Sequence, residues 1–392
     1  MKNTRKGFTL VELLVVIAIL AILGTVTVIS FTGCIQQAKL SADAQVAEQM
    51  NTALEAGSVM DKPENFGDVL TLLTDNGFEL KNFKTTAEGF SYYWSAEKNV
   101  IVLYNAEKNE VAYPVGLAEF DPSASVSVDD VLSNVALVGG EECDTIEEAF
   151  TYANAHPGST LHVLISSGIP DGGIEIKANM TIKGHGNALS GNGTRGLKVA
   201  VSNIKVAISD LNISVSGQGS QALQVNTPLE NVDLTIDNCQ ITARDYTIIL
   251  VGGKNINFTM TNSYSYGWTA LYVKSSDSNV KVEGSVLSSM NNVAAAETNA
   301  FSTINIHQCT GTKVEISDTK IDAETVGNNE QFWLDISHGA ASNTVVVTGC
   351  DIDDVANYHT FFNPDNNPNY VSYVTGEGNN LTVDGTEINL YE

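Results

Sequence analysis

The sequence predicts an α+β protein with three consecutive parts: a long N-terminal helix, a small antiparallel sheet, and a β-solenoid that takes up the rest of the chain. Three observations predict this order. An apolar run near the N-terminus continues into residues that favour helix, three short strand patterns follow, and a turn template then recurs to the end of the chain. At 392 residues the chain is long enough for two or three separate cores.

The composition is strongly acidic. Lys and Arg total 20 against 46 Asp and Glu, which gives a formal net charge of −26. Such a surface repels nucleic acid and anionic lipid headgroups, so nucleic acid is not an expected partner of the C-terminal part. A solvated exterior is the preferred explanation of these carboxylates, although their oxygen atoms leave Ca²⁺ binding open. The sequence predicts no cofactor and no metal site.

The first apolar run, Phe8 to Phe31, is about 24 residues long, enough to cross a bilayer core of about 30 Å as a helix. Three basic residues precede it and predict that everything after about residue 33 lies outside the cytoplasmic membrane. A secretory signal peptide would have a shorter apolar core followed by a small-residue cleavage site. A plain anchor fits the length, but it leaves Glu12 unexplained, since a carboxylate among apolar residues costs at least a few kcal/mol unless it is paired.

The segment Lys6-Gly7-Phe8-Thr9-Leu10-Val11-Glu12 resembles the class III leader of type IV pilins and pseudopilins. The resemblance implies that residues 1–7 are a leader that prepilin peptidase removes between Gly7 and Phe8, and that the new amino group of Phe8 is methylated. Glu12 would then pair with the Phe8 amine of a neighbouring subunit, which neutralises a buried charge and sets the register between subunits. Many members of the family have a helix-kinking proline, whereas Gly24 is the only helix breaker in this apolar run.

The transmembrane and assembly helix is expected to occupy residues 8–63. Residues 36–56 contain neither Pro nor Gly, and Gly57 and Pro63 are the signals that end the helix. One apolar stripe recurs at spacings of three and four and is expected to pack on a sheet: Leu40, Ala44, Ala47, Met50 and Leu54.

Residues 64–115 are predicted to form a small head with one short helix at Asp68–Asp75. Its three strand patterns are Phe90–Trp94, Val100–Tyr104 and Glu110–Tyr113. This arrangement resembles, more loosely than the leader does, the small pilin-like heads of Gram-positive bacteria. The aromatic side chains of the first strand are expected to pack against the helix rather than bind a ligand.

Residues 116–142 have the polar composition of a linker, and residues 143–392 are predicted to form the solenoid. A helix at Asp144–Ala155 is expected to cover the open first rung. Eight segments then share an apolar residue, any residue, and a Gly, Asn or Asp, at intervals of about 22 to 36 residues. The turn residues of this template are Gly184, Asp210, Asn238, Asn262, Gly284, Asp318, Gly349 and Gly385.

Such a period predicts stacked rungs whose turn residue adopts a left-handed or bridging conformation. The segment resembles the pectate-lyase-like right-handed parallel β-helix, including the entry pattern of helix, apolar strand and Ile-x-Gly. An antiparallel β-sandwich is the alternative, but it usually has more even strand spacing and more hairpin dipeptides.

The resemblance raises the question of polysaccharide cleavage, and the residues argue against it. Lyases of this fold use Ca²⁺ and a basic residue, yet the only arginines of the solenoid, Arg195 and Arg244, lie in no recognisable lyase motif. Hydrolases of the fold use clustered aspartates with a Gly-His-Gly segment. Here Gly184-His185-Gly186 belongs to the first rung, whereas Asp351, Asp353 and Asp354 follow about 30 Å further along the stack. Catalytic carboxylates must lie within about 5–10 Å of each other. We therefore predict that the chain is not an enzyme.

Binding is the remaining role for the solenoid. The candidate glycan-binding residues are Tyr264, Tyr266, Trp268 and Tyr272, whose flat rings can stack on sugars; Tyr246 and an aromatic group at residues 358–362 are further candidates. Packing of these rings on the protein's own surface is an equally good explanation.

The five cysteines give no readable disulfide pattern. Cys34 follows the apolar run, and Cys239 and Cys350 each follow a turn residue, so both are expected in one column of the stack. They are four rungs apart, about 20 Å, which is too far for a disulfide. Both are therefore expected to be buried thiols. Cys143 and Cys309 could each form a disulfide, but the sequence does not identify the partner.

The sequence thus predicts a type IV pilus-like filament subunit, a minor or tip pilin that displays an adhesive β-helical domain. Its expected partners are prepilin peptidase, other pilin subunits, the cytoplasmic membrane before assembly, and a glycan or other surface receptor. Its expected location is the membrane first and a cell-surface filament afterwards. Two alternatives stay open: a pseudopilin of a type II secretion or DNA-uptake machine, and a surface-tethered polysaccharide lyase or hydrolase.

Overall fold

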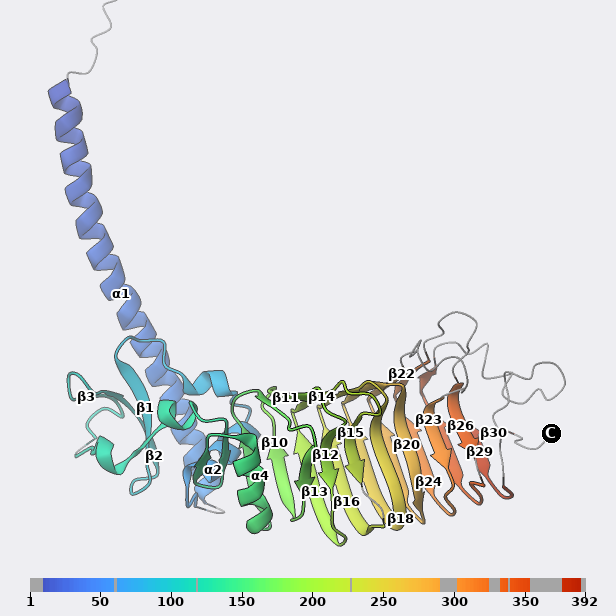
Figure 1. Cartoon of the computed structure of the whole chain (residues 1–392). Helices are drawn as coiled ribbons and strands as arrows, with labels where there is room; N and C mark the ends of the chain where they lie inside the picture. Colours follow the sequence, from blue (N-terminus) through green and yellow to red (C-terminus); the bar gives the residue numbers. More distant parts are fainter. Residues whose placement is uncertain are drawn as a thin grey trace, which may run out of the picture. The chain divides into compact units, whose positions relative to one another are not determined.

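The computed structural model of the chain describes residues 10–59, 62–117, 119–225, 228–289, 302–323, 332–337, 339–352 and 376–388. Within helices and strands a few side chains are not described, among them those of residues 10–12 and 20–31. The chain divides into two compact units, Met1–Val131 and Leu132–Glu392. We call them the N-terminal unit and the C-terminal unit (Figure 1).

Helix α1 (Leu10–Ser58) is continuous over 49 residues. This confirms that the helix of the apolar run extends through residues 36–56. It ends one residue after the expected stop signal Gly57, before the predicted bound at residue 63. The predicted apolar stripe faces the core of the N-terminal unit. Ala47, Met50 and Leu54 are fully buried, and Leu40 and Ala44 are half-buried.

The head of the N-terminal unit is a four-stranded antiparallel sheet in the order β3-β2-β1-β4. The three predicted strands are present with nearly the predicted bounds. The elements of the head are α2 (Phe66–Asp75), η1 (Leu80–Phe83), β1 (Phe90–Ser95), β2 (Val100–Asn105), β3 (Glu110–Tyr113), η2 (Pro122–Ala124), β4 (Val126–Ser127) and α3 (Val128–Val131). Asn65 caps α2 by accepting a hydrogen bond from the Asp68 amide, which satisfies one of the unpaired donors at the helix start.

Two polar side chains on the buried face of α1 fix the helix to the rest of the head. The Asp43 carboxylate accepts hydrogen bonds from the Thr86 amide (2.9 Å), the Thr86 hydroxyl (3.0 Å) and the Ala87 amide (2.8 Å). Asn51 accepts from the Ile101 amide (2.6 Å) and donates to the Ile101 carbonyl (2.9 Å). Tyr92 donates its hydroxyl to the Asp43 carbonyl, so this aromatic side chain packs against the helix as predicted.

Regular structure also occupies the predicted linker, residues 116–142. Its first half contributes β4 and α3 to the N-terminal unit. Its second half contributes β5 (Ala136–Val138) and β6 (Glu141–Cys143) to the C-terminal unit, where β5 pairs antiparallel with β6 and with β7. These linker strands have only two or three residues each, so the sequence shows no alternation that would predict them.

The C-terminal unit consists of large, mostly parallel sheets with few helices. Its strands pair in three ladders, each built from strands that lie one repeat apart in the sequence (Figure 1). The first ladder contains β7 (Ser159–Val163), β10 (Met180–Lys183), β13 (Ile204–Ser209), β16 (Glu230–Asp237), the end of β18 (Tyr246–Thr261), β21 (Asn279–Glu283), β24 (Lys313–Ser317), β27 (Thr344–Thr348) and β29 (Asn380–Val383).

The other two ladders repeat the same parallel pairing. The second ladder contains β8 (Ser167–Gly168), β11 (Ala188–Gly191), β14 (Asn212–Val215), β17 (Gln240–Ala243), β19 (Tyr264–Gly267), β22 (Val286–Ser289), β25 (Lys320–Ala323) and β28 (Asp351–Ile352). The third ladder contains β9 (Ile174–Ile176), β12 (Arg195–Val199), β15 (Gln221–Val225), the start of β18, β20 (Thr269–Ser276), β23 (Ser302–His307) and β26 (Phe332–Ser337).

The chain visits the ladders in a fixed order, shown by β13, β14, β15 and then β16. In the next repeat β18 serves both the third ladder and the first, and its register shifts between Val251 and Lys254. Gly252 and Gly253 have φ of +76° and +82° at this shift. A Cβ at Gly253 would overlap the Leu229 carbonyl oxygen, so only glycine fits.

The predicted turn residues mostly have the expected left-handed backbone. Their φ values lie between +48° and +61° for Asp210, Asn238, Asn262, Gly284, Asp318 and Gly349. In the first repeat the left-handed residue is instead His185 (φ +52°). Gly184 is required there for a different reason, because a Cβ would overlap the Asp210 carbonyl oxygen of the next repeat.

The last predicted repeat ends differently. Asp384 and Gly385 both have positive φ, +47° and +77°, and form a two-residue turn into β30 (Thr386–Ile388), which pairs antiparallel with β29. An Asp-Gly pair favours such a hairpin because both central residues need positive φ. At the other end, α4 (Ile146–Ala155) buries Ile146, Ala149 and Phe150 in the same core as the first strands of the unit, which agrees with the helix expected there.

Candidate functional site

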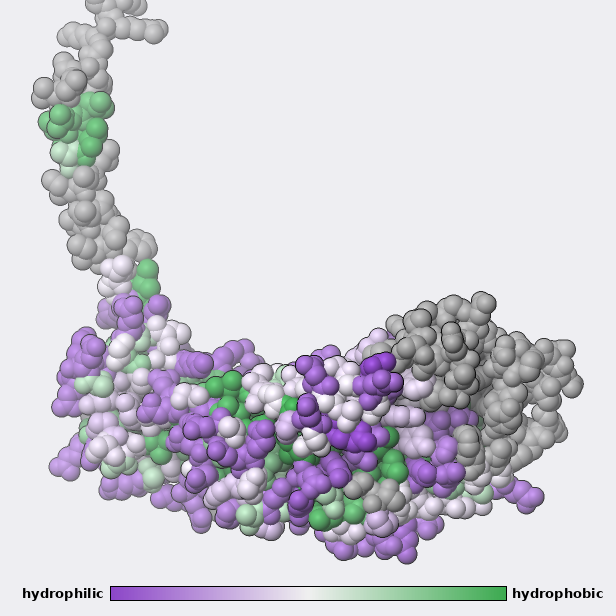
Figure 2. All heavy atoms as spheres, viewed as in Figure 1, coloured by the Kyte–Doolittle hydropathy of each residue, from purple (hydrophilic) through white to green (hydrophobic). Residues whose placement is uncertain are grey.

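The predicted cleavage and methylation residues, Gly7 and Phe8, lie outside the described residues, and so does the side chain of Glu12. What the structure does describe is an apolar band on α1 directly after Glu12. Its members are between 43% and 61% exposed, namely Leu13, Leu14, Val15, Val16, Ile17 and Ile19. Figure 2 shows this band on the helix in green. Burying each such side chain stabilises an assembly by about 1.5–3 kcal/mol, so the band favours association with lipid or with other apolar helices.

Within the described part of the chain, the structure has no helix that is both long enough and apolar enough to span a membrane. Residues 8 and 9 are not described, nor are the side chains of residues 10–12 and 20–31.

The four predicted glycan-binding residues fall into two sets. Tyr264 and Tyr266 are alternate residues of β19, in the second ladder, so they share one face of the strand. Their rings stack with centroids 5.9 Å apart and planes 20° apart. Both side chains are half-buried.

Trp268 and Tyr272 belong to the other set, which lies on the third ladder. We define the aromatic cluster as Tyr246, Trp268, Tyr272 and His307. Tyr246 lies 6.2 Å from Trp268 and 5.5 Å from Tyr272, centroid to centroid, and Tyr272 lies 5.5 Å from His307. Tyr246, Tyr272 and His307 come from successive strands of one ladder, β18, β20 and β23, which is why residues distant in sequence meet. Trp268 directly precedes β20.

The electrostatics of the aromatic cluster reflect its partial burial. Burial raises the pKa of Tyr272 well above its usual value of 10, and the Tyr246 hydroxyl and the Asp335 carboxylate add to the shift. Burial also raises the pKa of Tyr246, with a smaller effect of Asp245. Both phenols are therefore neutral hydrogen-bonding groups at neutral pH.

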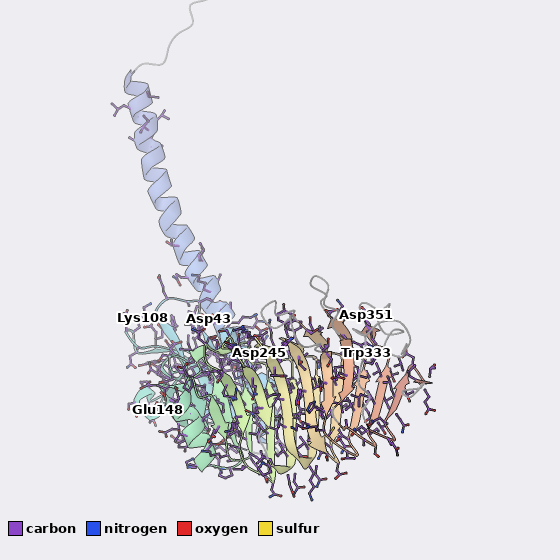
Figure 3. All side chains as sticks on the ribbon, turned by 45° about the vertical axis from the view of Figure 1, so that its right-hand side comes forward. Asp43, Lys108, Glu148, Asp245, Trp333 and Asp351 are labelled. Atoms are coloured by element: carbon purple, nitrogen blue, oxygen red, sulfur yellow. The ribbon has the colours of Figure 1, made fainter. Side chains whose placement is uncertain are left out.

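The backbone before Tyr246 is held by its neighbour Asp245. The Asp245 carboxylate is 6% exposed and accepts hydrogen bonds from the amides of Gly219 (2.8 Å) and Ser220 (3.3 Å) in the preceding repeat (Figure 3). In return the Ser220 hydroxyl accepts from the amides of Arg244 and Asp245. These reciprocal bonds fix where β18 begins and thereby where the Tyr246 ring stands.

The residues weighed for catalysis have structural partners. His185 of the Gly-His-Gly segment shares a hydrogen bond of 2.8 Å with the fully buried His162, and the two rings stack. Arg195 donates to the carbonyl oxygens of Thr194 and Gly219. Asp351 lies on β28, whereas Asp353 and Asp354 lie outside the described residues.

No group of three or more His, Cys, Asp or Glu side chains among the described residues is arranged to hold a metal ion. This finding does not test Ca²⁺ binding, which the composition leaves open. The aromatic group at residues 358–362 also lies outside the described residues.

All five cysteines are described and all are free thiols. Cys143, Cys239 and Cys309 are buried, and burial is the main cause that raises the pKa of each thiol to about 11. Cys350 is half-buried, also with a raised pKa, and Cys34 is exposed. The expectation of buried thiols at Cys239 is confirmed, and the low thiolate population makes these side chains poor nucleophiles.

Sequence reasoning missed the amides and the acid beside the aromatic cluster: Gln221, Gln224, Asn305 and Asp335. The strand register is what brings the last two to the cluster, since Tyr272 pairs with Asn305 and Asn305 pairs with Asp335. That register crosses two loops whose lengths differ, so the spacing alone does not reveal it.

A family model described as the prokaryotic N-terminal methylation motif matches residues 2–28. This match supports a class III prepilin leader and hence a type IV pilin-like or pseudopilin-like precursor. The motif implies processing by prepilin peptidase and assembly with other pilins, and it fits a membrane-anchored precursor of a surface filament. No curated protein and no solved structure matches the chain.

Proposed function

We propose that the chain is a minor or tip subunit of a type IV pilus-like filament and that its C-terminal unit is an adhesive display domain. The methylation motif at residues 2–28 carries the proposal. The continuous helix α1 and its exposed apolar band at residues 13–19 support it, because subunits of such a filament assemble through a long apolar helix.

In this proposal prepilin peptidase cuts between Gly7 and Phe8, and the amino group of Phe8 is methylated. The Glu12 carboxylate pairs with that amine on a neighbouring subunit. Leaving a buried charge without its partner costs about 3–5 kcal/mol per contact, so the pair selects one register between helices. Before assembly the precursor is held in the cytoplasmic membrane with its C-terminus outside.

We further infer that the C-terminal unit is a right-handed parallel β-helix. The three parallel ladders and the fixed order in which the chain visits them support this inference. Right-handed crossovers are the rule for parallel strands. Stacked rungs give an elongated surface that is suited to display.

A binding role is favoured over catalysis because the residues weighed for catalysis have structural partners, as His185 has in His162. A pseudopilin of a secretion or DNA-uptake machine is the second candidate, and the same methylation motif supports it. The third candidate is a surface-tethered polysaccharide lyase or hydrolase. Incubation of the purified chain with pectin or alginate and Ca²⁺ tests it, since a β-elimination product would make the chain a lyase.

The filament role is tested by Glu12→Gln in cells that assemble the filament. The variant is expected to be cut at Gly7 and to remain in the membrane, with incorporation reduced at least about tenfold, because a neutral amide cannot neutralise the charge of the Phe8 ammonium group. Glu48→Gln, an exposed glutamate on the same helix, is the matched control and should be incorporated normally. Normal incorporation of Glu12→Gln would defeat this account of the carboxylate.

Immunogold labelling separates the two filament candidates. A minor or tip pilin predicts label on surface filaments, at their ends or at sparse positions. Label confined to the cell envelope would favour the pseudopilin.

A further inference from the structure

Three amide side chains flank the aromatic cluster on the third ladder. Gln221 and Gln224 lie on β15, one strand before Tyr246, and Asn305 lies on β23, one strand after Tyr272. The register pairs Gln221 with Tyr246 and Tyr272 with Asn305. We call these five residues the amide–aromatic face.

Among the described residues, none donates a hydrogen bond to the amide oxygens of this face. The Oε1 atoms of Gln221 and Gln224 and the Oδ1 atom of Asn305 are all buried and unpaired. Asn305 is only 9% exposed, and its Nδ2 donates to Asp335 Oδ2 at 3.0 Å, which fixes the orientation of the amide. A buried acceptor without a donor costs about 1–3 kcal/mol, so three of them along one ladder point to donors beyond the described residues, such as the hydroxyl groups of a ligand.

The aromatic residues of the face specify what kind of donor fits. Tyr246 and Tyr272 are half-buried, with their rings in an edge-to-face arrangement 5.5 Å apart. A site that combines aromatic surface with a few well-placed polar groups suits a ligand with both apolar faces and hydroxyl groups. A pyranose ring has this character, because its C–H faces pack on aromatic rings while its hydroxyls donate to amide oxygens.

Charge narrows the class of sugar. One carboxylate, Asp335, contacts the face through Asn305. Lys274 lies on β20 two residues after Tyr272. The register also places Arg195 beside Gln221 and Lys198 beside Gln224, and Lys198 forms an ion pair with Glu175. The face therefore carries charges of both signs rather than a cluster of cations, and on a chain with a net charge of −26 it favours a neutral glycan over a polyuronate or a sulfated glycan.

We propose that the amide–aromatic face binds a neutral oligosaccharide, stacked on Tyr246 and Tyr272 with hydroxyl groups donating to Gln221, Gln224 and Asn305. The strands from β15 to β23 are three ladder steps apart, so the face is about 14 Å long and takes a short oligosaccharide. The proposal rests on the adhesive role given above and names its ligand class. It also assigns the binding to the third ladder rather than to the Tyr264–Tyr266 pair on the second.

The test measures binding of the purified, detergent-solubilised full chain by calorimetry. The probes are neutral β1,4-linked tetrasaccharides of glucose, N-acetylglucosamine and mannose, with tetragalacturonate as the acidic counterpart. At least one neutral probe is expected to bind. Tyr272→Ala should raise its Kd at least about tenfold, and Tyr264→Ala, the matched control on the other ladder, should leave the Kd unchanged.

Gln224→Met separates binding from stability. The substitution keeps the side-chain length but removes the unpaired amide oxygen. The Kd should rise about three- to tenfold while the Tm stays the same or rises, because an unpaired buried acceptor is lost. A lower Tm together with unchanged binding would assign Gln224 a structural role and overturn its part in the proposal.

Several outcomes overturn the proposal outright: no binding of any neutral probe, binding of tetragalacturonate alone, or loss of binding in Tyr264→Ala with retention in Tyr272→Ala. Incorporation of the same variants into filaments is measured in parallel. Normal incorporation with no neutral binding would refute this inference and leave the filament role intact, whereas failure of the Glu12 experiment would refute the filament role alone.

Discussion

Each of the two units is stabilised internally by its own kind of polar contact. In the N-terminal unit single side chains make contacts that occur once. Asp43 accepts hydrogen bonds from the amides of Thr86 and Ala87. Asn51 accepts from the Ile101 amide and donates to the Ile101 carbonyl. In the C-terminal unit one contact recurs from repeat to repeat. Asn231 donates to Asn203 and Asn255 donates to Asn231, while Asn279 and Asn257 extend a parallel row from Asp233.

This difference concerns how stability is distributed. A contact that occurs once has no substitute, so the loss of its side chain lowers the stability of the whole head. A repeated contact is one of many similar nearest-neighbour terms, so its loss weakens two adjacent rungs and leaves the others in place. We therefore expect substitution effects to be larger per polar side chain in the N-terminal unit.

The largest effect is expected for Asp43→Ala. The substitution leaves the buried amide of Ala87 and the amide of Thr86 without an acceptor, which should lower the free energy of unfolding of the N-terminal unit by about 2–5 kcal/mol. Denaturant unfolding measures this loss, and hydrogen exchange at Thr86 and Ala87 should accelerate. Glu48→Ala, on the exposed side of α1, is the control and should change the stability by no more than about 0.5 kcal/mol. A similar small effect for Asp43→Ala would refute the comparison.

Ile236→Ala tests an interior rung of the C-terminal unit. Ile236 is fully buried and pairs in register with Ile208 on one side and Met260 on the other. The cavity should cost about 2–4 kcal/mol. Hydrogen exchange should locate the loss to β13, β16 and β18, with more distant rungs unaffected. Thr235→Ala, the outward neighbour, should be close to neutral, and uniform loss of protection across the unit would contradict the nearest-neighbour description.

A smaller effect is expected at the turn residue Asn238, whose φ is +49° and whose Nδ2 donates to Asp210. Asn238→Ala should cost about 1–2 kcal/mol, because a Cβ without a polar tip disfavours the left-handed region. Asn238→Gly keeps the backbone freedom and should cost less than the alanine variant. Thermal melting of both variants measures the difference, and equal losses would show that the side-chain bond, rather than the backbone, sets the cost.

The smallest effect is expected for the surface ion pairs of Glu175. Lys177 and Lys198 hold the pKa of its carboxyl below the usual 4.5. A lowered folded-state pKa contributes stability that is present above 4.5 and is lost as the pH falls through the folded value. Glu175→Gln should therefore cost less than about 1 kcal/mol at pH 7, because the pairs are solvent-exposed, and nothing at pH 2. Stability curves at the two pH values check this, and a loss that persists at pH 2 would assign it to packing.

The sequence determined the elements that depend on local preference. Continuous helix formers set α1 from the apolar run to Ser58, and short runs of aromatic and β-branched residues in residues 90–113 set the three strands of the head. Seven of the eight predicted turn residues, all but Gly184, have positive φ, since Gly, Asn and Asp tolerate this backbone within their own repeat. The methylation motif is likewise a local pattern, and it is matched as such.

The tertiary structure decided which residues of different repeats stand side by side. Tyr272 meets Asn305, and Asn305 meets Asp335, only because loops of different length bring β20, β23 and β26 into one register. The same pairing separates Tyr264 and Tyr266 from Tyr272, although all of them lie within a few residues in the sequence. Helix and turn preferences act within a rung, whereas contacts between rungs follow from the packing of the whole core. For this reason the sequence identified aromatic candidates, and the fold alone assembled an amide–aromatic face from them.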